Sequence, residues 1–281
     1  MTTSLIIGCG YLGAVLAAQL HSEGGEVWVT ARAANRLADL EARFKTRGVE
    51  FDLNTSAAPL PNLELAADAI LDVYCLLTPS ALATPETRKR LLAFMARLPC
   101  RRAILTSSTG IYGVRDGSAV SAESAVEPAS ERSHRLLAIE EAWLHAPLRF
   151  VVRLAGLYGA GRVIGAQALR AGALIPGHPG AFLNLIHCAD AASLLRACMA
   201  APRMARIEIG SDGTPTTRER YYQYTAARLG ARTPVFEGAA STPDLGKVVD
   251  PRSTMARVAW RPNFPSFREG LAEALAPPSA E

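Results

Sequence analysis

Residues 5–13 read LIIGCGYLG, a short apolar run followed by glycines at positions 8, 10 and 13. The apolar run is typical of a buried strand, and the residues after the loop show helical spacing at Leu12, Val15, Leu16 and Leu20. A GxGxxG loop between a strand and a helix presents backbone amides to a pyrophosphate. The alternative is a purely structural glycine turn. We predict a dinucleotide site that includes Gly8, Gly10, Tyr11, Leu12 and Gly13.

The segments that follow alternate between strand-like and helical patterns. Helices are predicted from the Thr84-Pro85 start and over 133–144, and strands at 27–29, 49–53, 73–77, 103–106 and 150–154. This βαβ order predicts an α/β fold, a doubly wound parallel sheet of the Rossmann type, in a dinucleotide-binding domain of residues 1–160.

Beyond residue 160 the chain becomes richer in glycine and proline. A helix is expected near 190–199 and a strand at 206–209. We predict that residues 161–281 form a smaller substrate-binding lobe, of which roughly 184–210 return to the Rossmann sheet. A lobe of this kind closes over the carboxyl ends of the strands, where ligands of open α/β sheets bind.

Composition argues against several classes of protein. Of 281 residues, 49% are hydrophobic and 20% charged, and no apolar stretch approaches the ~20 residues of a membrane-spanning helix. The net charge of +4 is spread without a basic, aromatic-interleaved tract, so no nucleic acid partner is expected. The five scattered cysteines form no CxxC pair or His/Cys cluster, so no metal site is expected. We expect a cytoplasmic protein without a membrane partner.

Residues 29–36, which read VTARAANR, bear on the choice of cofactor. Enzymes that prefer NAD commonly carry an acidic residue ~20 positions after the glycine loop, where it binds the ribose hydroxyls. No carboxylate is present here, and Arg32 and Arg36 can pair with a 2′-phosphate. We therefore predict NADP as the cofactor and keep NAD as the alternative, in which case both arginines are solvated residues at a helix start.

Three later motifs carry a family resemblance: TSSTGIYG at 106–113, RLAGLYGAGR at 153–162 and NLIHCAD at 184–190. Over nearly its whole length the chain resembles the extended short-chain dehydrogenase/reductase superfamily, in the NAD-dependent epimerase/dehydratase branch. It is most similar to a divergent bacterial subgroup of nucleoside-diphosphate-sugar-epimerase-like proteins. The glycine spacing departs mildly from the GxxGxxG that is usual in this family.

The resemblance implies roles for particular residues. Ser108, four positions before the tyrosine of the Tyr-Gly pair, falls on the family's catalytic Ser/Thr. Asp52 and Leu53 fall on the pair that reads adenine. Further cofactor contacts, including the turn beside the nicotinamide ribose, are expected at Leu77, Thr78, Pro79, Thr106 and Ser107.

One departure from the family is severe. The active-site tyrosine and the lysine four residues later, which donate a proton and lower the tyrosine pKa, are replaced by Ser133 and Leu137. Ser133 has no adjacent base and is a poor substitute, so if hydride chemistry persists the candidates to move the proton are His134, Tyr112 and Tyr158. For His134 the alternative is an exposed helix residue, and for Tyr112 it is a hydrogen-bonded core tyrosine.

Candidate substrate residues follow the sixth predicted strand and the 184–190 motif. Arg153 either holds an anionic substrate or forms an internal ion pair, and Tyr158 stands in the same motif. Asn184 and His187 are further candidates, although His187 is also placed to secure the helix that follows it.

Two functional hypotheses remain open. The first is an NADP-dependent oxidoreductase or epimerase/dehydratase that acts on a small polar substrate, nucleotide-linked in one version. The alternative is a catalytically impaired NADP-binding redox sensor or regulatory protein. Dehydrogenases that reduce imines or β-hydroxy acids fit the first 30 residues but not the later motifs. The helices at 84 and 133 can pair across a homodimer.

Overall fold

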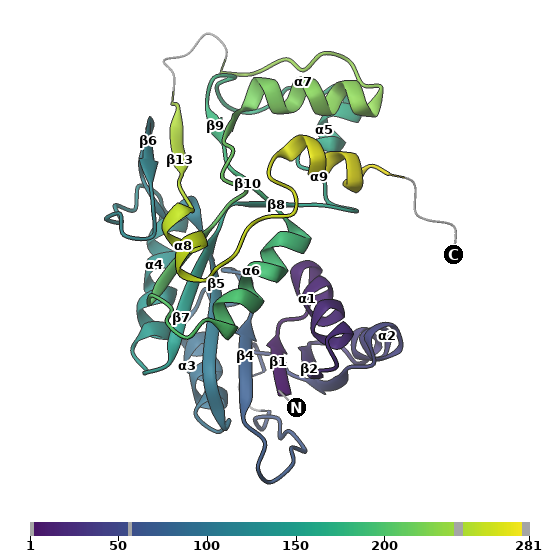
Figure 1. Ribbon diagram of the computed structural model, residues 1–281, viewed down its shortest axis with the longest axis vertical. Coiled ribbons are helices and arrows are strands. Elements are labelled where there is room, and N and C mark those ends of the chain that lie inside the picture. Colours follow the sequence, from purple (N-terminus) through teal and green to yellow (C-terminus); the bar gives the residue numbers. More distant parts are fainter. Residues whose placement is uncertain (1–2, 56–57, 239–243, 277–281) are drawn as a thin grey trace.

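A seven-stranded, entirely parallel sheet forms the centre of the computed structural model, which describes residues 3–55, 58–238 and 244–276 (Figure 1). Its strand order is β11-β7-β5-β4-β1-β2-β3. The strands are β1 (Thr3–Ile7), β2 (Glu26–Ala31), β3 (Arg47–Glu50), β4 (Leu71–Cys75), β5 (Cys100–Ser108), β7 (Arg149–Leu154) and β11 (Ile207–Gly210). The predicted α/β, doubly wound fold is confirmed.

Helices cover both faces of this sheet. One face carries α1 (Tyr11–Ser22), α2 (Ala34–Phe44) and α6 (Cys188–Ala200), and the other carries α3 (Pro85–Met95) and α4 (Glu131–Leu144). Each helix buries an apolar stripe against strand residues that alternate between the faces. The Thr84 hydroxyl accepts a hydrogen bond from the Thr87 amide, which caps α3 as its sequence predicts.

The strand order creates a ligand crevice by topology. From β1 the chain winds outward through β2 and β3, then returns to the other side of β1 and continues through β4, β5, β7 and β11. The reversal lies between β1 and β4. Loops leave these neighbouring strands on opposite faces, and the crevice between them is where open α/β sheets bind their ligands.

The remaining elements gather beside the carboxyl ends of the sheet, with α5, α7, α9 and β9 together at the top of Figure 1. Three strand pairs occur here: β8 with β10, β9 with β12, and β6 with β13. Tyr158, Tyr221 and Phe267 belong to an apolar cluster of their own. The elements are β6 (Asp116–Val120), β8 (Gly156–Tyr158), β9 (Phe182–Leu183), β10 (Leu185–His187), β12 (Thr216–Thr217), β13 (Gly246–Val249), η1 (Thr109–Ile111), α5 (Ala166–Ala171), α7 (Arg218–Leu229), α8 (Arg252–Arg257) and α9 (Phe267–Ala274).

Several boundaries differ from the expected ones. Strand β5 continues to Ser108 because its ladder with β7 extends to the pair Ser108–Leu154, so residues 106–108 end the strand instead of following it. Strands β3 and β4 end at Glu50 and Cys75, which leaves 51–53 and 76–79 in loops. Pairing between strands, which a local pattern does not contain, sets these ends.

Candidate functional site

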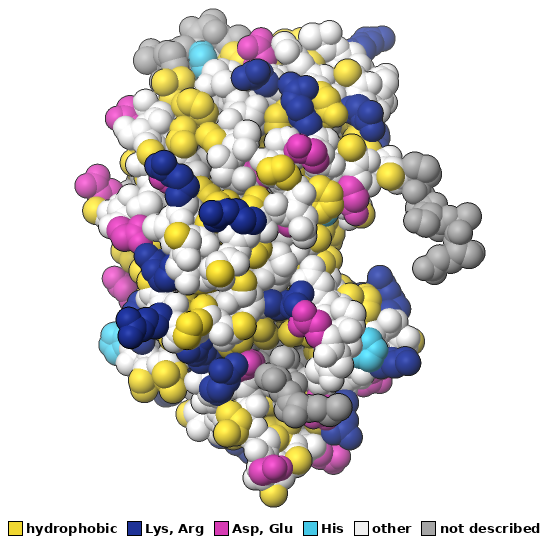
Figure 2. All heavy atoms as spheres, viewed as in Figure 1, with side chains coloured by type: hydrophobic (Ala, Val, Ile, Leu, Met, Phe, Trp, Pro, Cys, Tyr) yellow, Lys and Arg dark blue, Asp and Glu magenta, His cyan; other side chains and the backbone are white. Residues whose placement is uncertain are grey.

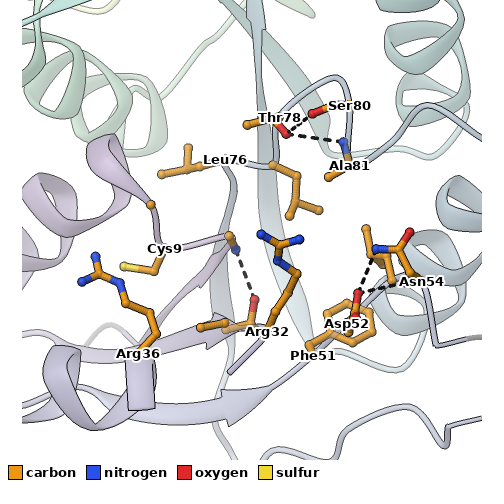
Figure 3. A pocket seen from close by; sticks show the side chains of 16 residues that line it. Cys9, Arg32, Arg36, Phe51, Asp52, Asn54, Leu76, Thr78, Ser80 and Ala81 are labelled. Atoms are coloured by element: carbon orange, nitrogen blue, oxygen red, sulfur yellow. Dashed lines mark hydrogen bonds between the residues drawn. The ribbon is translucent and has the colours of Figure 1, made fainter. Parts of the chain in front are cut away.

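A pocket of about 560 Å³ lies at the carboxyl ends of β1, β2, β3 and β4, at the topological reversal (Figure 3). Of the residues expected to bind cofactor, it is lined by Gly8, Gly10, Arg32, Arg36, Asp52, Leu53, Leu77 and Thr78. The other lining residues are Cys9, Thr30, Ala31, Phe51, Asn54, Leu76, Ser80 and Ala81. The remaining expected contacts, which do not line it, are Tyr11, Leu12, Gly13, Pro79, Thr106 and Ser107. The size suits a nucleotide-sized ligand.

The glycine turn is held open by bonds to β2. Thr30, which is buried, accepts the Gly8 amide on its hydroxyl at 3.1 Å and the Cys9 amide on its carbonyl at 3.2 Å. Gly8 has φ +88°, and a Cβ there would lie 2.9 Å from the Leu77 side chain. Only glycine meets both constraints.

Helix α1 begins directly after this turn and has no side-chain cap. Its first internal bond runs from the Ala14 amide to the Gly10 carbonyl at 3.0 Å. The preceding amides, of Tyr11, Leu12 and Gly13, have no partner among the residues that the structure describes. Such free amides at a helix start favour a phosphate.

Two arginines face the pocket from the end of β2 and the start of α2, and they differ in their bonding. The Arg36 guanidinium pairs with Asp39 at 2.5 Å. Arg32 is exposed, points into the middle of the pocket in Figure 3, and forms no hydrogen bond or ion pair with any described residue. Among the residues that the structure describes, Arg32 is therefore the cation of this pocket that has no counter-charge.

The far end of the pocket is formed by the loop after β3. Phe51 is buried, and its ring centroid lies 4.6 Å from that of Phe94. The Asp52 carboxylate accepts hydrogen bonds from the Asn54 amide at 3.0 Å and from its side chain at 3.1 Å. Sequence analysis missed Phe51 and Asn54, although both adjoin the predicted Asp52–Leu53 pair. It missed Thr30 because only the register of β1 and β2 places that residue opposite Ile7.

Three of the residues expected to be catalytic lie around the end of β5 and the start of α4: Ser108, Tyr112 and Ser133. Ser108 ends β5, and its hydroxyl accepts the Gly110 amide at 3.1 Å. Tyr112 is buried; its hydroxyl donates to the Ser121 carbonyl at 2.7 Å and accepts from Arg153 at 2.8 Å. Burial raises the Tyr112 pKa although Arg153 lowers it. Tyr112 thus has the bonding of a core tyrosine, whereas Ser108 remains half-exposed.

Ser133, at the position of the missing tyrosine, belongs to a helix cap. Its hydroxyl accepts the Ser130 amide at 2.9 Å, and its own amide donates to the Ser130 hydroxyl at 3.1 Å. This reciprocal capping box begins α4. His134, the next residue, is exposed. The structure therefore gives Ser133 a local structural role and leaves His134 on the surface of α4.

Ser107, expected at the cofactor, has an unusual environment. Its hydroxyl is buried and has no hydrogen-bond partner among the described residues. The neighbouring Thr106 donates its hydroxyl to the Cys75 carbonyl at 3.4 Å. A buried hydroxyl without a partner costs free energy.

The expected substrate residues are mostly bonded within the protein. Arg153 donates to Glu140 at 2.6 Å, and both side chains are only 2% exposed, so the internal ion pair is what the structure contains. Tyr158 is fully buried. Asn184 bonds the backbone of β13, at the Lys247 carbonyl and the Val249 amide. His187 caps α6 and contacts Glu273 at 3.0 Å.

Asp212, which sequence analysis did not single out, lies two residues after β11. Its side chain is buried, and its Oδ2 has no hydrogen-bond partner among the described residues. Burial raises its pKa to about 7; the Asp190 and Glu269 carboxylates add to this rise, and the Thr214 amide opposes it. A buried carboxyl at the carboxyl edge of the sheet thus holds its proton near neutral pH.

This raised pKa predicts how stability depends on pH. Between pH 3.8 and about 7 the folded chain keeps the Asp212 proton and the unfolded chain releases it. The free energy of unfolding therefore carries a contribution that is full below that window and declines across it by at most about 1.4 kcal/mol per pH unit. Asp212→Asn should remove this decline. In urea denaturation, the free energy of unfolding of the variant should therefore rise relative to that of wild type from pH 4 to 7. Asp68→Asn, at an exposed position, is the control. If the free energy of unfolding depends on pH equally in all three proteins, the prediction is contradicted.

The surface around the site is uneven. Figure 2 shows an indentation at the right-hand edge, between the part that carries α9 and the part that carries α1 and α2.

Among the described residues, no helix is long and apolar enough to cross a membrane, and no group of three or more His, Cys, Asp or Glu side chains is arranged to hold a metal ion.

No protein-family model matches the chain, and no curated protein matches it. Solved structures do. A candidate NAD-dependent epimerase/dehydratase from Methylobacillus flagellatus is 23% identical, with a TM-score of 0.77 over 98% of this chain and 97% of that one. The UDP-glucose 4-epimerase of Thermotoga maritima, solved with UDP-glucose, is 15% identical, with a TM-score of 0.75 over 98% and 97%. The dTDP-glucose 4,6-dehydratase of Bacillus anthracis, solved with NAD, is 14% identical, with a TM-score of 0.76 over 98% and 96%. The chain has the fold of these enzymes along almost its entire length.

Proposed function

We propose that this chain is an NADP-dependent oxidoreductase or epimerase/dehydratase of the extended short-chain dehydrogenase/reductase superfamily. The observation that carries the proposal is the pocket at the β1–β4 reversal, with the glycine turn that precedes the bare amides of α1 at one end and, inside it, Arg32, which has no partner among the described residues. Pyrophosphate binds such amides, and a 2′-phosphate binds a free guanidinium. Enzymes of the same fold that are solved with NAD support the nicotinamide dinucleotide.

Each site residue would bind a different part of the cofactor or the substrate. Arg32 would hold the 2′-phosphate, Asp52 the adenine and Thr78 the ribose next to the nicotinamide. The bound cofactor supplies or accepts hydride. Ser108, at the end of β5, would donate its hydroxyl hydrogen to the substrate oxygen and orient it.

The substrate would be a small polar molecule with a carbonyl or secondary alcohol, bound by a lobe of residues 161–281 that packs beside a Rossmann domain of residues 1–160. Enzymes of the same fold act on nucleotide-linked sugars, as the UDP-glucose 4-epimerase does, which supports a nucleotide-linked substrate. We place the protein in the cytoplasm. A homodimer would pair α3 and α4, which lie together on one face of the sheet.

A second candidate function rests on one specific observation. Tyr112 and Ser133 are both occupied by internal hydrogen bonds, so neither hydroxyl is a free acid–base group, and His134 lies on the exposed surface of α4. This favours an NADP-binding sensor that responds to redox state without turnover. The two functions differ in whether any substrate oxidises the bound NADPH.

Binding and turnover experiments test the proposal. Purified protein should bind NADPH in a fluorescence titration, and a panel of carbonyl compounds should include one that oxidises it. Ser108→Ala should then lower the rate by at least about tenfold, because a positioned hydroxyl assists proton transfer and orientation. Ser22→Ala, an exposed serine at the end of α1, is the control. Unchanged activity in Ser108→Ala would remove Ser108 from the mechanism, and tight NADPH binding without oxidation would favour the sensor.

A further inference from the structure

Lysine is rare in this chain, and one lysine differs from the others. Only three of the 30 basic residues are lysines: Lys45, Lys89 and Lys247. Lys45 and Lys89 are exposed on the surface, whereas Lys247 is half-buried in β13.

Backbone contacts fix the direction of the Lys247 side chain. Along a strand, alternate residues share a face, so Lys247 projects on the same side as Val249. Val249 is buried in a cluster with Ile111 and Tyr112, next to the carboxyl end of β5. The Lys247 ammonium donates to the Tyr112 carbonyl at 3.2 Å. Asn184 holds this stretch of β13 in place by bonding the Lys247 carbonyl at 2.8 Å and the Val249 amide at 2.7 Å.

The strand beside Lys247 is irregular at the same point. In the β6–β13 pair, Gly246 lies opposite Asp116 and Val248 opposite Ala119, so two residues, Gly117 and Ser118, face Lys247 alone. Gly117 has φ +86°, a value that favours glycine. Bulges are rare in parallel pairs, and next to active sites they redirect a side chain. The extra residue belongs to β6, so it is β6 that bends beside Lys247.

Within the described residues, Lys247 has no close counter-charge. No carboxylate of the described residues lies within 4 Å of its ammonium, and its one hydrogen-bond partner is a neutral carbonyl. Asp244, three residues earlier, pairs with Arg115 at 2.8 Å. Burial lowers the pKa of Lys247, against an opposing effect of Asp244. A half-buried cation of this kind is stabilised when an anion joins it.

Lys247 also lies near the proposed reacting site. Tyr112, whose carbonyl it contacts, ends the 3₁₀ turn that Ser108 begins. At about 2 Å of rise per residue, the turn spans roughly 8 Å. We propose that Lys247 binds an anionic group, a carboxylate or a phosphate, of the same small molecule that Ser108 engages. The inference rests on the proposed function for the identity of that molecule, and it adds that the molecule is an acid or a phosphate ester at this end.

Competitive amine labelling of the full chain tests the anion site, with acetic anhydride as the reagent and mass spectrometry to follow each lysine. Inorganic phosphate and acetate are compared with chloride at constant ionic strength. A bound anion that raises the amine's pKa by one unit leaves about a tenth of the neutral amine. In one of the two anions, the labelling rate of Lys247 should therefore fall about tenfold, whereas the labelling rates of Lys45 and Lys89 should fall less than about twofold. The more protective anion identifies the group as carboxylate or phosphate. Equal effects at Lys247 and Lys89 would overturn the proposal.

Variants give a second readout. With NADPH present, the protective anion should raise the melting temperature of wild type, Lys247→Arg and the surface control Lys89→Met, and should fail to raise that of Lys247→Met. An equal rise in Lys247→Met would also overturn the proposal. NADPH titration of the same four proteins reports the cofactor site separately. If wild type does not bind NADPH but an anion still protects Lys247 from labelling, the proposed function is rejected and the anion site stands.

Discussion

Arg32→Ala is expected to weaken NADPH binding by about 10- to 100-fold and to change NADH binding by less than about threefold, because a charge-assisted hydrogen bond contributes about 1.5–3 kcal/mol. The structure selects Arg32 for this effect because its guanidinium faces the pocket and has no partner within the part of the chain that the structure describes (Figure 3). Fluorescence titration with both nucleotides measures the ratio of the two dissociation constants.

Arg36→Ala is the matched control for that experiment. Arg36 lines the same pocket, but its guanidinium pairs with Asp39 at 2.5 Å, so its loss should reduce NADPH affinity less than the loss of Arg32. Because both nucleotides share every group except the 2′-phosphate, a parallel weakening of NADPH and NADH in Arg32→Ala would mean that Arg32 does not read that phosphate. Equal affinities in wild type would reject the NADP preference itself.

Glu140→Ala is expected to lower the free energy of unfolding by about 3–5 kcal/mol, since it leaves the Arg153 guanidinium buried without a counter-charge. The two side chains are each 2% exposed and joined by bonds of 2.6 to 3.2 Å. Arg153 also donates a hydrogen bond to the Tyr112 hydroxyl at 2.8 Å, so the substitution should also destabilise the turn after Ser108. Urea denaturation measures the change.

Two comparisons make the stability experiment specific. Glu141→Ala removes an exposed carboxylate one residue away and should change stability by less than about 0.5 kcal/mol. The double variant Glu140→Leu/Arg153→Met removes both charges and should recover much of the loss, because no unpaired charge stays buried. A loss as large in the double variant as in Glu140→Ala would show that lost packing, and not the unpaired charge, causes the destabilisation.

Much of the fold was predictable because its signals are local. A glycine loop after an apolar strand, helical spacing after the loop, and the Thr84-Pro85 helix start all depend on neighbouring residues. The same holds for Arg32, a loop residue that lines the pocket, since it follows the strand predicted at 27–29. Element ends were less predictable, and β5 reaches Ser108 only because β7 pairs with it.

The acid–base candidates show where local patterns stop being informative. Tyr112 is identified by a motif, but its bond to Arg153 joins residues 41 positions apart. Ser133 falls on the position of the missing tyrosine, yet it pairs with Ser130 to cap α4. A hydroxyl's availability depends on which donors and acceptors the fold brings to it, and the sequence does not state that.

The sequence by itself determined the α/β architecture and the glycine turn, because hydrophobic period and glycine placement act over a few residues. Only the tertiary structure decided which charges are paired. It buries Arg153 against Glu140, leaves Arg32 without a partner among the described residues, buries the Asp212 carboxyl with one oxygen unbonded there, and brings Lys247 to a carbonyl 135 residues away. The free energy of a charge depends on its solvent and its nearest counter-charge, and folding sets both.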